Sequence, residues 1–184
     1  MKKVTTPFTN EELKQLKAGD SVLLSGYIYT ARDAAHKRLI ELLEQEKPLP
    51  FNVEGQTIYY VGPSPAKEGK LIGSAGPTTS YRMDAYTPQL LSKGLKGMIG
   101  KGKRSKEVTD AMKKHGAVYF AAIGGAAALN AKCVKAYELI AYEDLGAEAI
   151  TRLLVEDMPL VVVIDSEGVN YYETGQQEYL KSIE

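Results

Sequence analysis

The chain has 184 residues, a length that fits a single domain, residues 1–184, with a hydrophobic core of its own. Its 23 basic residues balance its 23 acidic residues, so no net charge attracts a polyanion and nucleic-acid binding is not expected. One cysteine and two histidines argue against a disulfide and against a metal site in this chain. With no apolar leader or membrane span recognisable, we expect a cytoplasmic, non-membrane protein.

In chain order, helices and strands are predicted to alternate before a strand-rich end. The predicted helices are a short one starting at the capping box Thr9–Glu12, then Arg32–Glu46, Tyr81–Leu91 with Pro88 near its end, Ser105–His115 and Gly124–Ala131. The predicted strands are Ser21–Tyr29, Thr57–Val61, Lys70–Ser74, Gly97–Gly100, Ala117–Ile123, VKAYELIAY, EAITRLLV, PLVVVID and VNYYE. This pattern predicts an α/β layered domain with a mixed sheet and a strand-rich C-terminal part, rather than a doubly wound fold.

The first stretch that could carry chemistry is TARDAAHKRL, residues 30–39, where a strand ends and a helix begins. Asp33 complements the positive end of the helix dipole, but Arg32 opposes it unless an anion is held there. Arg32 is therefore either an anion ligand or a solvated side chain. His36, one turn later, is expected to be structural.

The second stretch is SAGPTTSYRMDAY, residues 74–86. Its Gly-Pro-Thr-Thr-Ser turn can present N–H groups and hydroxyls to an anion at a helix start, and Arg82 adds a planar fork suited to a carboxylate. The alternative is a plain helix cap with Arg82 paired to Asp84 or a glutamate on the surface.

The third stretch is GMIGKGKRSKE, residues 97–107, which nearly fits the phosphate-loop template. Arg104 stands where that template needs a hydroxyl, so nucleotide binding is not expected. What remains is a glycine-flexed loop that carries Lys101, Lys103 and Arg104 to a helix start, either as an anion site or as a solvated basic loop.

Each of these stretches follows a strand and precedes a helix, where open α/β sheets gather their ligand-binding loops. If Arg32, Arg82 and Lys101 converge, they form a pocket for a dianion such as a small dicarboxylate. The chain shows no Cys/His cluster, metal set or catalytic triad. It therefore either only binds its ligand or works with a partner that brings the catalyst.

The blocks ARDAAHKRL, SAGPTTSYRMDAY, MIGKGKRS and AVYFAAIGGAAALNA, in this order, resemble the C-terminal domain or separate β subunit of class I iron-sulfur fumarate hydratases and L(+)-tartrate dehydratases. The resemblance covers nearly the whole chain. It implies a swivelling β/β/α domain docked on an α subunit that holds a [4Fe-4S] cluster, commonly in an α2β2 assembly. This chain would hold no metal itself.

The resemblance also assigns roles to individual residues. Arg32, Arg82 and Lys101 match the family's substrate-binding cations, and Thr78 matches the residue proposed as the catalytic base. The implied reaction is the reversible hydration of fumarate to L-malate. The alternatives are L(+)-tartrate dehydration by the same kind of subunit, and a non-catalytic dicarboxylate-binding module.

Overall fold

A computed structural model describes residues 1–66, 68–122 and 127–175. Five of the seven strands run parallel: β1 (Lys2–Thr6), β2 (Ser21–Thr30), β3 (Thr57–Tyr59), β4 (Gly97–Gly100) and β5 (Val118–Ala122). The long strand β7 (Ile150–Ile164) runs antiparallel to its neighbours β2, β5 and β6 (Val134–Ala141). The α/β class with a mixed sheet is confirmed.

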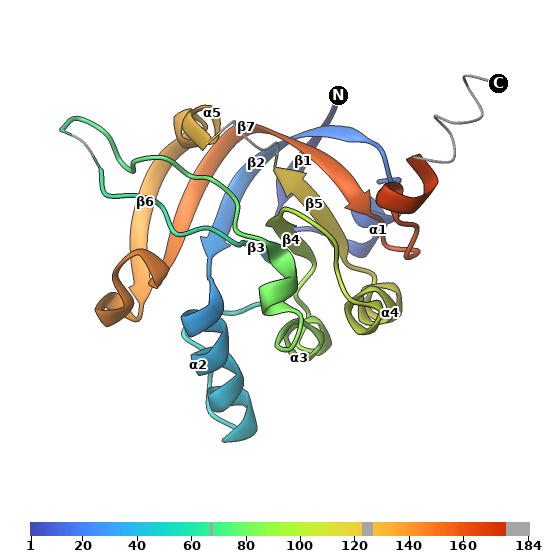
Figure 1. Ribbon diagram of the computed structural model, residues 1–184, viewed down its shortest axis with the longest axis horizontal. Coiled ribbons are helices and arrows are strands. Elements are labelled where there is room, and N and C mark those ends of the chain that lie inside the picture. The colour runs from blue at the N-terminus through green and yellow to red at the C-terminus, as the bar shows by residue number, and fades with distance from the viewer. Residues whose placement is uncertain (67, 123–126, 176–184) are drawn as a thin grey trace.

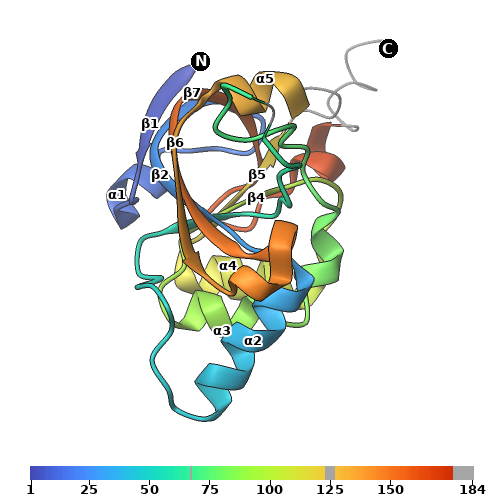
Figure 2. The same ribbon diagram turned by 90° about the vertical axis from the view of Figure 1, so that its left-hand side faces the viewer.

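The sheet closes on itself like a barrel, because β7 pairs with β5 on one side and with β2 on the other. Figure 2 shows the strands curving round this closure. The inner face is filled by aliphatic and aromatic side chains, including Leu24, Ile28, Phe120 and Leu160. The barrel is therefore a packed core.

The helices that follow β2, β3 and β4 cover the outer face of the sheet, as Figure 1 shows. They are α2 (Asp33–Glu44) after β2, the short 3₁₀ helix η1 (Ser80–Met83) with α3 (Thr87–Ser92) after β3, and α4 (Lys106–His115) after β4. A second buried cluster lies between these helices and the sheet and includes Leu39, Met83, Leu90 and Met112.

The remaining elements connect or flank these layers. They are α1 (Asn10–Lys14), α5 (Ala127–Lys132) and the 3₁₀ helix η2 (Glu143–Glu148). The predicted capping box is confirmed: Thr9 accepts a hydrogen bond from the Glu12 N–H, and Glu12 accepts one from the Thr9 N–H. No helix in the described ranges is long and apolar enough to cross a membrane.

Several predicted elements were wrong. Residues 70–74 form no strand, because this segment bonds to a neighbouring loop through contacts such as Gly73 N–H to Ser64 O. VNYYE, residues 169–173, leaves the sheet after a single bridge from Asn170 to Ile164. EAITRLLV and PLVVVID belong to one strand, β7, which continues through Pro159. Residues 123–126, which include the start of the predicted Gly124–Ala131 helix, lie outside the described residues.

The predicted helix over Tyr81–Leu91 is two helices, because Pro88 stands in the first turn of α3 and so begins a helix. Proline is favoured there because the first helical N–H groups have no intrahelical acceptor.

Candidate functional site

The site lies at the carboxyl ends of the parallel strands β2, β3 and β4. Strand register places Thr30, Tyr59 and Ile99 in one row. Arg32 and Lys101 therefore each follow that row by two residues, at the same edge of the sheet. Ligand-binding loops gather at this edge in α/β sheets because the strands deliver their following loops to one place.

Thr78 reaches this edge through backbone bonds of the segment that precedes η1. Its N–H donates to the Tyr60 carbonyl at 2.7 Å, directly after β3. The next residue, Thr79, forms a parallel bridge with Lys101. The threonine segment thus lies between the ends of β3 and β4, and it brings Thr78 beside Lys101.

Arg32 and Arg82 are brought together by one carboxylate. Asp33 Oδ1 lies 2.8 Å from Arg82 Nε, and Asp33 Oδ2 lies 3.9 Å from Arg32 Nε. Glu148, from η2, contacts Arg32 Nη2 at 3.2 Å and also accepts from the Ala34 N–H at the start of α2. The two arginines therefore lie around one carboxylate, while the convergence of Lys101 with them stays a prediction.

Gly62 makes room for Arg32 after β3. A Cβ at this position would lie 2.8 Å from Arg32 Nη1 and 3.0 Å from the Ala147 carbonyl, so a larger residue would require the arginine to shift. The arginine therefore passes close over the backbone of Gly62.

The site combines three cations with two carboxylates. Arg32 is about one-quarter exposed and Arg82 is 44% exposed, so both guanidinium groups keep N–H donors open to solvent. Lys101 is exposed and makes no ion pair within the described residues. Likewise, no side chain of the described part hydrogen-bonds the Thr78 hydroxyl. The arrangement suits a small dianion that brings two carboxylates.

His36 is buried behind Arg32 and bonds to its backbone, as expected for a structural residue. It is fully buried, its Nδ1–H donates to the Arg32 carbonyl at 2.9 Å, and its ring packs edge-on against Tyr60. Burial lowers the pKa of His36 from 6.5 to about 4, a shift that the bond to Arg32 opposes in part. The imidazole is therefore neutral at physiological pH.

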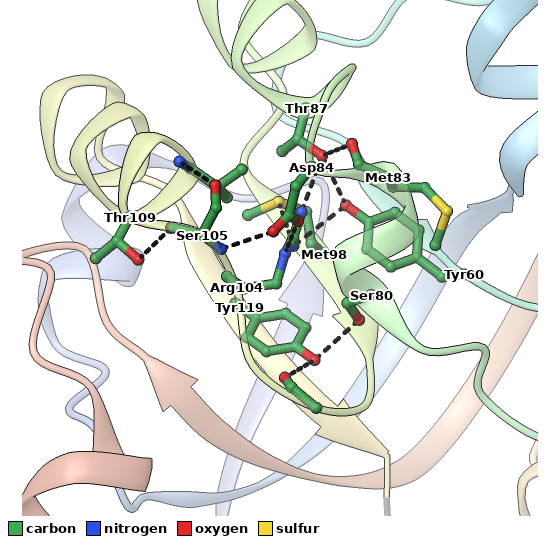
Figure 3. A network of polar contacts seen from close by, with 12 residues as sticks. Tyr60, Ser80, Met83, Asp84, Thr87, Met98, Arg104, Ser105, Thr109 and Tyr119 are labelled. Atoms are coloured by element: carbon green, nitrogen blue, oxygen red, sulfur yellow. Dashed lines mark hydrogen bonds and ion pairs between the residues drawn. The ribbon is translucent and has the colours of Figure 1, made fainter.

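Arg104 is not part of this surface, contrary to the basic-loop prediction. Its side chain is fully buried and lies between the rings of Tyr60 and Tyr119, as Figure 3 shows. Its Nε donates to Asp84 at 2.7 Å, and Asp84 also accepts from the Ser105 N–H at 2.6 Å.

The three consecutive residues Arg82, Met83 and Asp84 therefore have different surroundings. Arg82 faces the surface, Met83 is buried among the helices, and Asp84 anchors the segment to Arg104. The predicted alternative, a surface pair between Arg82 and Asp84, is wrong because each has a different partner.

Some of these residues carried no recognisable sequence signal. Asp33 was expected only to complement a helix dipole, yet it bridges the two arginines. Glu148 lies far along the chain, and only the closure of the sheet brings it to Arg32. The acidic residue expected to pair with Arg82 was Asp84, two positions later in the sequence, but Arg82 pairs with Asp33 instead.

Comparison with known proteins places this chain in a family. The family model described as the fumarase C-terminus matches residues 2–175. The chain belongs to this family of fumarase C-terminal domains. It is 42% identical over 164 residues to "Fumarate hydratase 2" of Leishmania major, covering 88% of this chain and 29% of the relative.

Two further relatives differ in how much of their length this chain covers. "Fumarate hydratase class I, aerobic" of Escherichia coli (strain K12) is 41% identical over 88% of this chain and 30% of the relative. "Putative L(+)-tartrate dehydratase subunit beta" of Methanocaldococcus jannaschii is 40% identical over 90% of this chain and 88% of the relative. The chain thus spans about 30% of the length of these fumarate hydratases but most of the subunit.

Proposed function

We propose that this chain is the β subunit of an iron-sulfur-dependent hydro-lyase that interconverts fumarate and L-malate by reversible hydration, in a site shared with an α subunit. The proposal rests on two groupings in a fumarase-family domain: Arg32 and Arg82 share the Asp33 carboxylate, and the segment of Thr78 and Thr79 bonds to the ends of β3 and β4 at Tyr60 and Lys101. Fumarate and malate each bring two carboxylates, which match a site rich in cations.

A relative that is named as a subunit supports a partner. The chain is 40% identical to this "Putative L(+)-tartrate dehydratase subunit beta". We therefore propose that the remaining part of the enzyme is a separate α subunit, with an α2β2 assembly as the expected form. The cytoplasm is the proposed compartment.

The residues of this chain do not fit the [4Fe-4S] cluster expected from the resemblance. Such clusters take several cysteine thiolates, whereas this chain has one cysteine, and burial raises the pKa of the Cys133 thiol. Across residues 1–66, 68–122 and 127–175, no three histidine, cysteine or acidic side chains group as metal ligands. The proposal therefore assigns the cluster to the α subunit.

The proposed work of this chain is to bind and orient the substrate. The guanidinium groups of Arg32 and Arg82 bind carboxylate oxygens, and Lys101 adds a point charge that stabilises negative charge on a carboxylate as the reaction proceeds. In the dehydration direction, Thr78 accepts the proton from the carbon next to the one that loses its hydroxyl. A neutral hydroxyl is a weak base, and no group of the described part bonds to it, so its activation is assigned to the α subunit.

L(+)-tartrate is the second candidate substrate. It is also a four-carbon dicarboxylate, and the β-subunit relative that this chain nearly spans carries that substrate in its name. Its additional hydroxyl would have to be accommodated by groups at the rim of the site, which include those of the α subunit.

Calorimetric titration tests the shared-site proposal against a free-standing binding module. Fumarate, L-malate and L(+)-tartrate are titrated onto the isolated chain and onto its complex with the α subunit. The shared site predicts millimolar or weaker binding to the isolated chain and much tighter binding to the complex. Saturation of the isolated chain at micromolar ligand would show a binding module and overturn the proposal.

A further inference from the structure

Lys101 is held against the Thr78–Ser80 segment by a chain of hydrogen bonds that starts at its own backbone. The Ser80 N–H donates to the Lys101 carbonyl at 2.9 Å, and the Lys101 N–H donates to Ser80 Oγ at 3.1 Å. Ser80 is completely buried. One serine therefore contacts both the N–H and the C=O of the lysine.

Tyr119 extends this chain and fixes its direction. Its hydroxyl donates to the Gly102 carbonyl at 2.9 Å, so its oxygen is the acceptor in the 2.9 Å contact with Ser80 Oγ. Each hydroxyl has only one proton to donate. The order is therefore Lys101 N–H to Ser80, Ser80 O–H to Tyr119, and Tyr119 O–H to Gly102, as Figure 3 shows for the Ser80–Tyr119 contact.

Gly100 completes the arrangement by leaving space for the Ser80 hydroxyl. A Cβ on Gly100 would lie 2.0 Å from Ser80 Oγ and 3.0 Å from Cδ2 of the Tyr60 ring. The serine oxygen thus occupies the place that a side chain at position 100 would take. Any larger residue there has to displace Ser80, and with it the acceptor of the Lys101 N–H.

We propose that Ser80 is a positioning residue that fixes Lys101 relative to Thr78, and that Gly100 is the space it requires. The consequence for substrate binding rests on the proposed function, because it takes Lys101 as a substrate contact. The hydrogen-bond and packing part concerns this chain alone. The two parts can therefore fail separately.

Hydrogen exchange tests the positioning in the full chain without a partner or substrate. In Ser80→Ala, the Lys101 amide is expected to exchange about tenfold faster than in the wild type, because its acceptor is lost. Tyr119→Phe is the second variant, with a smaller acceleration expected. Ser92→Ala is the matched control, since Ser92 Oγ donates to the Gln89 carbonyl on the exposed end of α3. Unchanged Lys101 exchange in Ser80→Ala and Tyr119→Phe would overturn the proposal.

A double-mutant cycle tests the pairing of Ser80 with Gly100. Gly100→Ala is expected to raise the unfolding equilibrium constant about tenfold or more, because the new methyl group overlaps the serine hydroxyl. In the double variant Ser80→Ala/Gly100→Ala, the Gly100→Ala change should destabilise the fold much less, because the serine hydroxyl is gone and only the close contact with Tyr60 remains. Lys101 exchange stays fast in the double variant, since a methyl group accepts no hydrogen bond. Simple addition of the two single effects would contradict the pairing.

Kinetics of the reconstituted enzyme test the consequence for the substrate. Ser80→Ala is expected to raise KM for the dicarboxylate about fivefold and to reduce kcat less, because a less ordered Lys101 weakens substrate binding. A purely structural role would leave KM unchanged in the folded variant, and that result would overturn the substrate part. If the wild-type mixture has no activity, the proposed function fails, while exchange and the cycle still decide the positioning.

Discussion

The Asp33 carboxylate lies between the two arginines of the site, with one oxygen 2.8 Å from Arg82 Nε and the other 3.9 Å from Arg32 Nε. The 2.8 Å ion pair restricts the rotamers of Arg82, whereas the shorter ion pair of Arg32 is with Glu148, at 3.2 Å. Under the proposed function, this ordering prepares the arginines for the substrate before it binds.

Asp33→Asn tests this ordering in the reconstituted enzyme. We expect kcat to fall on the order of 10- to 100-fold, because misplaced cations stabilise the transition state less well. KM should stay equal or fall, since the site loses a negative charge that competes with the substrate. Asp144→Asn is the control, because Asp144 of η2 pairs with Arg38 of α2 on the exposed surface. A raised KM with an unchanged kcat would contradict the ordering role.

Arg82→Lys tests whether the planar fork of the arginine is needed. Lysine keeps the charge but cannot bind a carboxylate through two parallel N–H groups. Loss of one charge-assisted hydrogen bond is expected to raise KM about 10- to 100-fold. The matched control is Arg38→Lys, which changes an exposed Asp144 pair. Equal KM values for Arg82→Lys and the wild type would show that the guanidinium group of Arg82 does not bind the substrate.

The buried ion pair between Arg104 and Asp84 is expected to contribute more to the free energy of unfolding than an exposed pair does. Asp84→Ala leaves a fully buried guanidinium without its carboxylate, which should reduce the free energy of unfolding by about 3 to 5 kcal/mol in urea denaturation. Asp110→Ala is the control, because its pair with Lys106 is exposed and should change stability by about 1 kcal/mol or less. Similar losses for both variants would argue against the anchoring role of Asp84.

His36 predicts a loss of stability in mild acid. Its pKa is about 4 when folded, against 6.5 as the ordinary value, so the unfolded chain binds more protons between these pH values. Stability through this residue is therefore complete above about pH 6.5 and falls as the pH drops, by about 3 kcal/mol at pH 4. His36→Gln should flatten the dependence of unfolding free energy on pH over this window. An unchanged slope in that variant would show that other groups cause it.

Residues near one another in the sequence allowed most of the local structure to be predicted. The Thr9–Glu12 capping box, β2, α2 and α4 follow from capping residues and apolar periodicity. Pro88 was misread because a proline can either end one helix or begin another, and here it begins α3.

Arg32 and Lys101 could be predicted to lie at one edge because each follows a strand, and parallel strands deliver their ends to one edge. The strand predicted before Arg82 does not form, and Arg82 comes from η1 instead. Their partners could not be predicted in the same way. Glu148 reaches Arg32 only because β7 closes the sheet. Asp84 pairs with the buried Arg104 rather than with Arg82, and it also accepts a hydrogen bond from the Ser105 N–H. Such pairings depend on tertiary distances that no local pattern contains.

The most direct test of the shared site is an anaerobic assay of the chain alone and mixed with cluster-loaded α subunit. Hydration of fumarate and dehydration of L-malate and L(+)-tartrate are followed at increasing ratios of the two subunits. The account predicts no turnover by either subunit alone and activity that saturates near equimolar mixing, with fumarate and malate preferred. Turnover by the isolated chain, or none with a well-loaded partner, would contradict it.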